Sequence, residues 1–221
     1  MSDKHDDSAE GTGAQSSGAS WLFGGSSPAA DSGEAAAAAL APLTWSASPT
    51  QQKLGELLEG GSEAVGRLSS PALHRLTNEL GLHDALELLE LASAEQVRDV
   101  LDLQVWSHDR VDLEELRDWL HALALLDDDA RRRHFRGLDV ELLGYLLRKC
   151  ATIYLANVED EPVPEEPRGT FYPTPDGWFL LDLQTETEAE LEQVTTLLDG
   201  LYTADAEWAR TLLQNLMWEL P

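Results

Sequence analysis

The sequence predicts a mainly α-helical protein of stacked short helices, solenoid-like, with one small β-hairpin near residues 170–183. Three observations lead to this fold class. Residues that cap helix N-termini recur after residue 48, and leucines recur behind them at helical spacing. A turn-forming Thr-Pro-Asp-Gly sequence, "TPDG", lies between two β-prone runs near residue 175.

Helix starts are indicated by Ser, Thr or Asp, several of which are followed three residues later by Glu or Gln. Such side chains bond the free N–H groups of the first helical turn. The predicted capping residues are Ser48, Ser70, Ser93, Asp112, Asp139 and Thr187. Proline follows two of these serines at the first helical position, where its missing N–H costs nothing. Gly81 and Gly137 are predicted to end helices in the left-handed conformation.

The cap spacing also suggests a repeat. Ser70 and Ser93 are 23 residues apart, and Ser93 and Asp139 are 46 apart, twice that distance. Residues 48–158 are therefore predicted to be a helical-repeat domain, in which short helices bury their apolar stripes by stacking. The helix expected from Asp139 to about Asn157 has a broad apolar stripe and should be central and buried.

Two segments interrupt or precede the helices. Residues 1–47 are acidic and rich in Ser, Gly and Ala, which predicts a disordered tail. Within it, Trp21 and Phe23 in "SWLFGG" are candidates for a short peptide that docks on a partner. Residues 159–169 are acidic and proline-rich, which predicts a linker.

Residues 170–221 are predicted to form the hairpin and two closing helices, all packed on the helical domain. Two strands alone are marginally stable, so we expect the hairpin to pack on helices through Phe171, Trp178 or Phe179.

Composition limits the partners. Acids outnumber bases by 41 to 15, giving a formal charge of −26. This disfavours nucleic acid and anionic membrane surfaces, and favours basic proteins or divalent cations. No apolar run is long enough to insert into a membrane, and no secretory leader is recognisable. The single cysteine, Cys150, fits a reducing compartment, so the expected location is cytoplasmic.

The dipeptide His-Asp occurs twice and raises the question of a metal site. The candidate ligands are His74, His83, Asp84, His108 and Asp109. A metal-dependent phosphohydrolase would need about four such groups to converge. The simpler interpretation is that Asp84 caps the helix after Gly81 and that Asp109 lies in a polar loop before Asp112. We prefer this second interpretation, and no cofactor is expected.

A basic cluster, "ARRRHFRG", stands out in the acidic chain. Its arginines are Arg131, Arg132, Arg133 and Arg136. They could dock an acidic or phosphorylated partner. Alternatively they complement the negative end of a helix and pair with the acids at 127–129. Cys150 falls on an apolar stripe, which predicts a buried and unreactive thiol.

The stretches "GLHDALELLELAS", "VLDLQVWSHDR" and "MWELP" resemble an uncharacterised bacterial family of unknown function, over about residues 50–221. The family pattern has Asp at the positions of Asp84 and Asp109 and does not require the histidines. Its members usually continue past "WELP", so the chain is expected to be a fragment or a shortened member. The capped, Leu-rich helices are also similar in pattern to the intracellular helical domain of magnesium transporters and to flagellar motor-switch repeats. The resemblance implies no activity.

The sequence therefore favours a non-enzymatic interaction or regulatory scaffold that binds a protein partner. Two alternatives stay open: a metal-dependent hydrolase that uses the His-Asp residues, and a divalent-cation-sensing domain suggested by the excess of acids. The sequence does not determine the oligomeric state.

Overall fold

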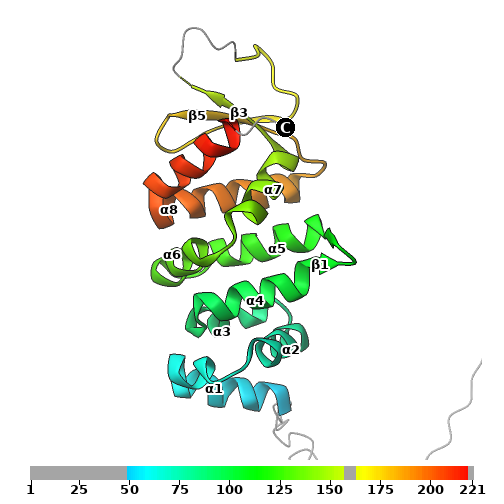
Figure 1. The fold of residues 1–221 in the computed structure, drawn as a ribbon, viewed down its shortest axis with the longest axis vertical. Coiled ribbons are helices and arrows are strands. Elements are labelled where there is room, and N and C mark those ends of the chain that lie inside the picture. Colours follow the sequence, from blue (N-terminus) through cyan, green and yellow to red (C-terminus); the bar gives the residue numbers. More distant parts are fainter. Residues whose placement is uncertain (1–48, 157–162, 219–221) are drawn as a thin grey trace, which may run out of the picture. The chain divides into compact units, whose positions relative to one another are not determined.

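The structure is a computed structural model that describes residues 49–156 and 163–218. The predicted tail at residues 1–47, with Trp21 and Phe23, lies outside the described residues, as does the start of the predicted linker. The described residues form helices α1 to α8, one short 3-10 helix and five short strands (Figure 1). This confirms the prediction of a mainly α-helical fold.

The helices and strands follow one another along the chain without long connections between them. They are α1 (Pro49–Gly66), α2 (Ser70–Leu80), the 3-10 helix η1 (His83–Ala85), α3 (Leu86–Leu91), α4 (Ala94–Val105), β1 (Trp106–Ser107), β2 (Arg110–Val111), α5 (Leu113–Ala124), α6 (Asp128–Gly137), α7 (Val140–Cys150), β3 (Ala151–Leu155), β4 (Thr170–Pro173), β5 (Phe179–Leu183) and α8 (Glu188–Trp218).

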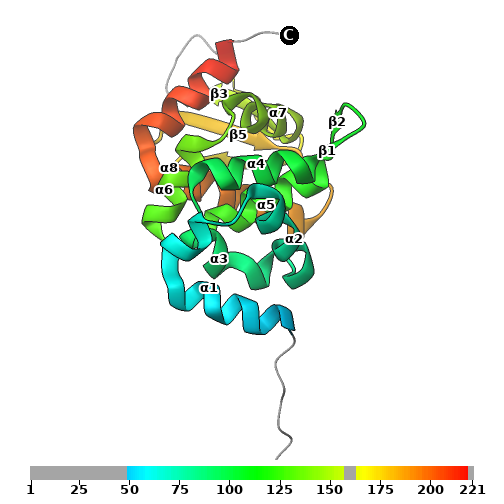
Figure 2. The same cartoon turned by 60° about the horizontal axis from the view of Figure 1, so that its bottom comes forward.

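Each helix packs on those that follow it. α1 contacts α2 and α3, α2 contacts α4, and α4 contacts α5 and α6. α8 then packs against α5, α6 and α7, and the sheet formed by β3, β4 and β5 lies beyond α7 and α8 (Figures 1 and 2). One apolar core runs through the stack, and Trp119, Phe135 and Phe179 are its largest fully buried side chains. No helix in the described ranges has the length and apolar character needed to span a bilayer.

The predicted cap at Ser93 is confirmed as a full capping box. The Ser93 hydroxyl accepts from the Gln96 N–H at 3.1 Å, and the Gln96 side chain accepts from the Ser93 N–H at 3.0 Å. The Gln96 amide also donates to the carbonyls of Val65 and Leu68, at 3.0 and 2.8 Å. Val65 lies in the last turn of α1 and Leu68 lies just after it, so one buried side chain joins the end of α1 to the start of α4.

Two other predicted helix boundaries are wrong in detail. Ser69, not Ser70, is the extended residue before α2, and the Ser70 hydroxyl instead donates to Asp99 at 2.8 Å. Gly81 ends α2 with a positive φ of 90°, but its ψ of 146° is not that of the predicted left-handed conformation, and Gly137 has no positive φ. A Cβ at Gly137 would lie 2.6 Å from the Cβ of Ala94, so glycine is needed there for close helix packing.

The helix predicted from Asp139 to about Asn157 ends earlier, at Cys150. Residues Ala151–Leu155 form β3, which pairs antiparallel with β5 in a sheet of order β3-β5-β4. Thr152, Ile153 and Tyr154 favour a strand, and a short apolar run cannot be assigned to helix or strand by its spacing alone. The third strand also supports the hairpin, because two strands alone are marginally stable.

The predicted hairpin is confirmed as β4 and β5, with Gly177 at a positive φ of 70° in its turn. Phe179 packs into the core with 1% of its surface exposed, whereas its neighbour Trp178 is 55% exposed. The buried carboxylate of Asp182 accepts from the N–H groups of Arg168 and Gly169, both at 2.9 Å. This side chain fixes the segment that enters β4.

The two predicted closing helices form one element, α8, with a break in the middle. Asp205 has an extended backbone, with φ −165° and ψ 96°. Its carboxylate accepts from the Trp208 N–H at 3.1 Å, so it caps the second half of the helix.

The imidazole of His134 on α6 lies fully inside the core. Its Nε2 bonds the Leu89 carbonyl at 3.0 Å, which makes Nε2 the protonated nitrogen. Burial lowers the pKa of His134 to about 4, with the charge of Arg133 acting in the same direction. His134 is therefore neutral at pH 7.

This burial predicts a pH dependence. Because the pKa of His134 is lowered in the folded state, its contribution is complete above its ordinary pKa of 6.5 and is lost as pH falls toward 4. The free energy of unfolding should fall by roughly 3 kcal/mol over that range on account of this residue. Urea unfolding of His134→Gln between about pH 4 and pH 7 should show a shallower pH slope than unfolding of the parent. Equal slopes in the two proteins would contradict this assignment.

Candidate functional site

Large apolar side chains on the described surface gather at hollows. Seven such side chains are exposed, and five of them line hollows: Leu103, Trp106, Tyr145, Trp178 and Trp218. The hollow lined by Trp178 and Trp218 has a volume of about 610 Å³, within the size range of small-ligand sites. We call it the aromatic cleft.

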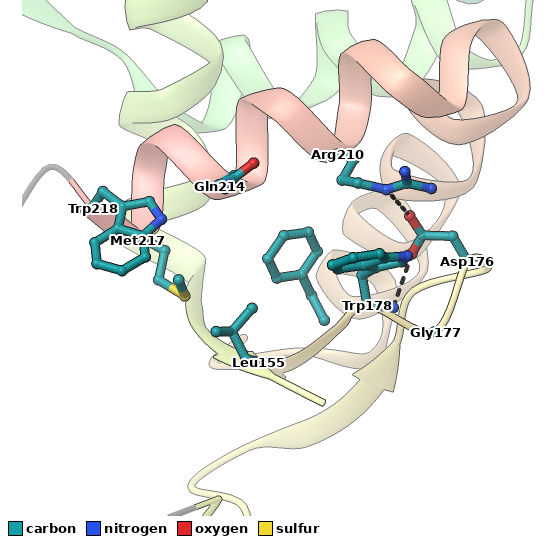
Figure 3. A pocket seen from close by; sticks show the side chains of 9 residues that line it. Leu155, Asp176, Gly177, Trp178, Arg210, Gln214, Met217 and Trp218 are labelled. Carbon is teal, nitrogen blue, oxygen red and sulfur yellow. Dashed lines mark hydrogen bonds and ion pairs between the residues drawn. The ribbon is translucent and has the colours of Figure 1, made fainter. Parts of the chain in front are cut away.

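The aromatic cleft lies between the end of β3, the turn before β5 and the end of α8 (Figure 3). Trp178 stands at one end, and Trp218 and Met217 stand at the other. Leu155 of β3 and the buried ring of Phe179 supply further apolar surface. Apolar and aromatic walls of this kind suit an apolar side chain or a small apolar molecule.

The indole of Trp178 is held in place by its neighbours. The guanidinium of Arg210 lies over the ring, 5.1 Å from the centroid. The Nε of Arg210 donates to Asp176 at 2.8 Å, and the other Asp176 oxygen accepts from Thr174 and from the Trp178 N–H at 2.7 and 3.1 Å. Asp176 thus fixes the backbone of the turn and the position of Arg210, and Arg210 covers one face of the ring, so the indole has less freedom to lose on binding.

The carboxyl group of Asp176 is ionised over a wide pH range. Burial acts to raise its pKa, but the hydrogen bonds from Thr174, Arg210 and the Trp178 N–H outweigh it. The net effect is a pKa below its usual value of 3.8. The cleft therefore keeps the Arg210–Asp176 ion pair at neutral pH.

The cleft offers binding surface rather than a pair of reactive groups. Asp176 is the one carboxylate among the described residues that line it, and it is already bonded to Arg210. General acid–base catalysis needs groups whose pKa values are moved toward the working pH, and the pKa of Asp176 moves the other way. Gln214 adds an exposed amide at the rim.

The first His-Asp pair lies in η1, and both side chains are exposed. The residue before η1 is Leu82, and no side-chain cap bond is made there or at the start of α3. The prediction that Asp84 caps a helix is therefore wrong. The 3-10 turn comes between Gly81 and α3, and it removes Asp84 from the capping position.

The second His-Asp pair forms the turn of a small hairpin. His108 and Asp109 connect β1 and β2, with positive φ values of 49° and 62°. Two-residue hairpin turns with two positive φ values match the twist of the strands, and His and Asp tolerate this conformation better than most residues. The predicted loop is thus a tight turn, and Asp112 caps α5 by accepting from the N–H groups of Glu114 and Glu115.

The structure does not bring the predicted metal ligands together. His74, on α2, bonds Gln104 at 2.7 Å and Asn78 at 3.1 Å. Across residues 49–156 and 163–218, no group of three or more His, Cys, Asp or Glu side chains is placed to hold a metal ion.

The arginines of α6 bond to the protein itself. Arg131 donates to the carbonyls of Ala124 and Leu126, at 3.0 and 3.1 Å, and pairs with Asp128. Arg132 donates to the Ala204 carbonyl at 2.7 Å.

Arg133 and Arg136 also bond to other parts of the protein. Arg133 donates to the Glu90 carbonyl, and Arg136 pairs with Asp205. Of the acids expected as partners, Asp128 binds Arg131, whereas Asp127 caps α6 through the Ala130 N–H at 2.7 Å. These contacts favour the interpretation of the cluster as a set of helix-end contacts.

The thiol of Cys150 is buried, as its place on the apolar stripe predicts. Burial raises its pKa to about 11, so the reactive thiolate is scarce at pH 7.

The aromatic cleft is not predicted by the sequence. The sequence predicts Trp178 only as a packing residue of the hairpin, and no local pattern indicates a contact between Trp178 and Arg210. One sign was available: in "DGWF", two aromatic residues follow a turn, and alternation along a strand places only one of them inside.

The lowered pKa of Asp176 leads to a stability prediction. Asp176→Asn should lower the free energy of unfolding by about 1–2 kcal/mol at pH 7, because a hydrogen-bonded charge is lost. The contribution is complete above pH 3.8 and is lost as pH falls through the lower folded-state pKa, so the two proteins should converge in acid. Urea unfolding at pH 7 and pH 3 measures the difference. Glu165→Gln, an exposed carboxylate, is the control, and an equal loss there would argue against the ion pair.

Comparison with known proteins gives a family but no activity. A family model described as a family of unknown function, DUF6178, matches residues 48–221. No curated protein and no solved structure matches the chain, so the likeness of pattern to magnesium-transporter and motor-switch helices gains no support. The match covers most of the chain, and the chain belongs to the DUF6178 family.

Proposed function

We propose that this protein is a non-enzymatic binding module that holds an apolar side chain of a protein partner in the aromatic cleft. The observation that supports this most is the exposed indole of Trp178, which lies under the guanidinium of Arg210, itself bonded to Asp176. Trp178 and Trp218 are 55% and 67% exposed. Grouped exposed aromatic side chains on a folded surface are typical of interaction sites.

The chemistry of the cleft defines the partner. Rigid tryptophans provide large contact area at low entropy cost and dominate the energy of many protein interfaces. The apolar surface of Leu155 and Met217 suits a leucine or aromatic side chain. The Gln214 amide at the rim can bond the backbone of the same peptide, and the net charge of −26 favours a neutral or basic partner over nucleic acid.

A regulatory role in the cytoplasm remains part of this proposal. The hydrolase and cation-sensing alternatives both need several ligands to converge on one ion. Such a group is missing from the part of the chain that the structure describes, and the His-Asp residues there have local roles in a 3-10 turn and a hairpin turn.

Selection of a peptide library against the full chain tests the proposal. We expect selected peptides to share a leucine or aromatic residue, and Trp178→Ala should weaken their binding by about 30-fold or more, as at an interface hot spot. Binding is measured by fluorescence anisotropy of the labelled peptides.

Trp106→Ala is the matched control, because Trp106 is an exposed tryptophan outside the cleft. The Trp106→Ala variant should bind these peptides as tightly as the parent does. Peptides that bind both variants as well as the parent would show that the cleft is not the site.

A further inference from the structure

We propose that a groove along α4 binds a basic segment of a partner protein, in which Lys or Arg side chains alternate with apolar residues. Two hollows make up this α4 groove. One, of about 790 Å³, lies between the junction of α1 and α2 and the face of α4 from its start to Leu103. The other, of about 550 Å³, lies between the end of α4, the β1–β2 hairpin and the start of α7. Asp102 borders both, so they follow the same face of α4.

Carboxylates follow the whole length of the α4 groove. Glu95, Asp99 and Asp102 are spaced four and three residues apart, which places them on one face of the helix. Three more carboxylates border its other end: Asp109, Asp139 and Glu141. Arg110 is the one cation among the described residues lining the two hollows, and Arg98 beside them pairs with Asp99 at 3.7 Å. Six carboxylates thus face two arginines, so the groove is negative.

Asp102 lies at the centre of this charge. Partial burial raises the pKa of its carboxyl group, the charge of Arg98 opposes this, and the carboxylates of Asp139 and Asp99 add to it. The carboxylate of Asp102 accepts no hydrogen bond from the described residues. A cation that bound between these acids would relieve their mutual repulsion.

Aromatic and aliphatic side chains lie beside the acids. Trp106 is 51% exposed at the start of β1, and Leu103 and Tyr145 are also exposed. Lys149 already lies over the ring of Tyr145, 5.5 Å from its centroid. The indole of Trp106 has no such partner within the described part of the chain, and it can receive an ammonium or guanidinium group from a partner.

The arrangement of the charges favours a peptide over a metal ion. Three of the carboxylates follow one face of α4, the other three lie on the β1–β2 turn and at the start of α7, and no set of three or more potential ligands in the described ranges could hold an ion. An extended basic segment meets them one after another, and its apolar residues can contact Leu103 and Trp106. This surface is separate from the aromatic cleft, so the inference does not rest on the function proposed there.

The test uses the full chain and a defined probe, the acetylated peptide Lys-Leu-Arg-Leu-Lys-Leu-Arg amide, in about 150 mM salt to screen distant charges. Fluorescence anisotropy gives the dissociation constant, and amide NMR spectra locate the site. We expect shifts confined mainly to residues 95–111 and 139–145. Trp106→Ala should weaken binding about 10-fold or more, and Trp106→Phe should restore part of it.

Two controls separate the groove from general attraction to an acidic protein. Asp102→Asn should weaken binding several-fold, and Glu59→Gln, the same charge change on the exposed face of α1, should weaken it less than about twofold. Trp178→Ala should leave it unchanged. Equal losses from Asp102→Asn and Glu59→Gln, or no loss from Trp106→Ala, would overturn the proposal, as would no binding to the parent. Displacement of the peptide by millimolar Ca²⁺ at constant ionic strength would assign the groove to a divalent cation instead.

Discussion

The free carbonyl groups at the ends of short helices are the constraint on which this fold depends. Each helix ends in four carbonyls without an intrahelical partner, and a stack of short helices has many such ends inside it. Side chains of helix α6 donate hydrogen bonds to carbonyls at three such helix ends. Arg131 bonds the end of α5, Arg132 bonds the carbonyl before the break in α8, and Arg133 and His134 bond the end of α3. One basic helix thus connects elements far apart in the sequence.

The few bases of this chain are largely bound to other parts of the protein. With 15 bases against 41 acids, the arginines on α6, and Arg210 beside Trp178, bond to carbonyls or carboxylates of the chain. Three of the α6 arginines are nevertheless exposed, so positive charge lies on the surface there, whereas carboxylates predominate along α4. The net charge of −26 is set by the composition, and a charge of this sign favours basic over acidic partners.

The sequence predicts the parts of this structure that local chemistry decides. The capping box at Ser93, the cap at Asp112 and the hairpin turn before Gly177 depend on residues within a few positions of each other, and all three are confirmed. The errors arise where distant contacts decide. Ala151–Leu155 becomes a strand because β5 is available to pair with it, and Gly137 is required by the approach of Ala94. The aromatic cleft brings together β3, a turn and the end of α8, and no local pattern indicates such a meeting.

Both proposed binding surfaces arise where a hairpin joins the helical stack. Trp106 begins β1 directly after the buried Val105, and Trp178 precedes the buried Phe179 that begins β5. Because successive side chains of an extended chain point to opposite sides, burying Phe179 turns Trp178 outward. Trp106 is the first residue after α4 ends at the buried Val105, and its side chain is also exposed. A buried residue and an exposed tryptophan are thus neighbours at each hairpin. The buried residue packs on the core and the tryptophan does not, so truncating the tryptophan would remove the proposed binding surface without opening a cavity in the core.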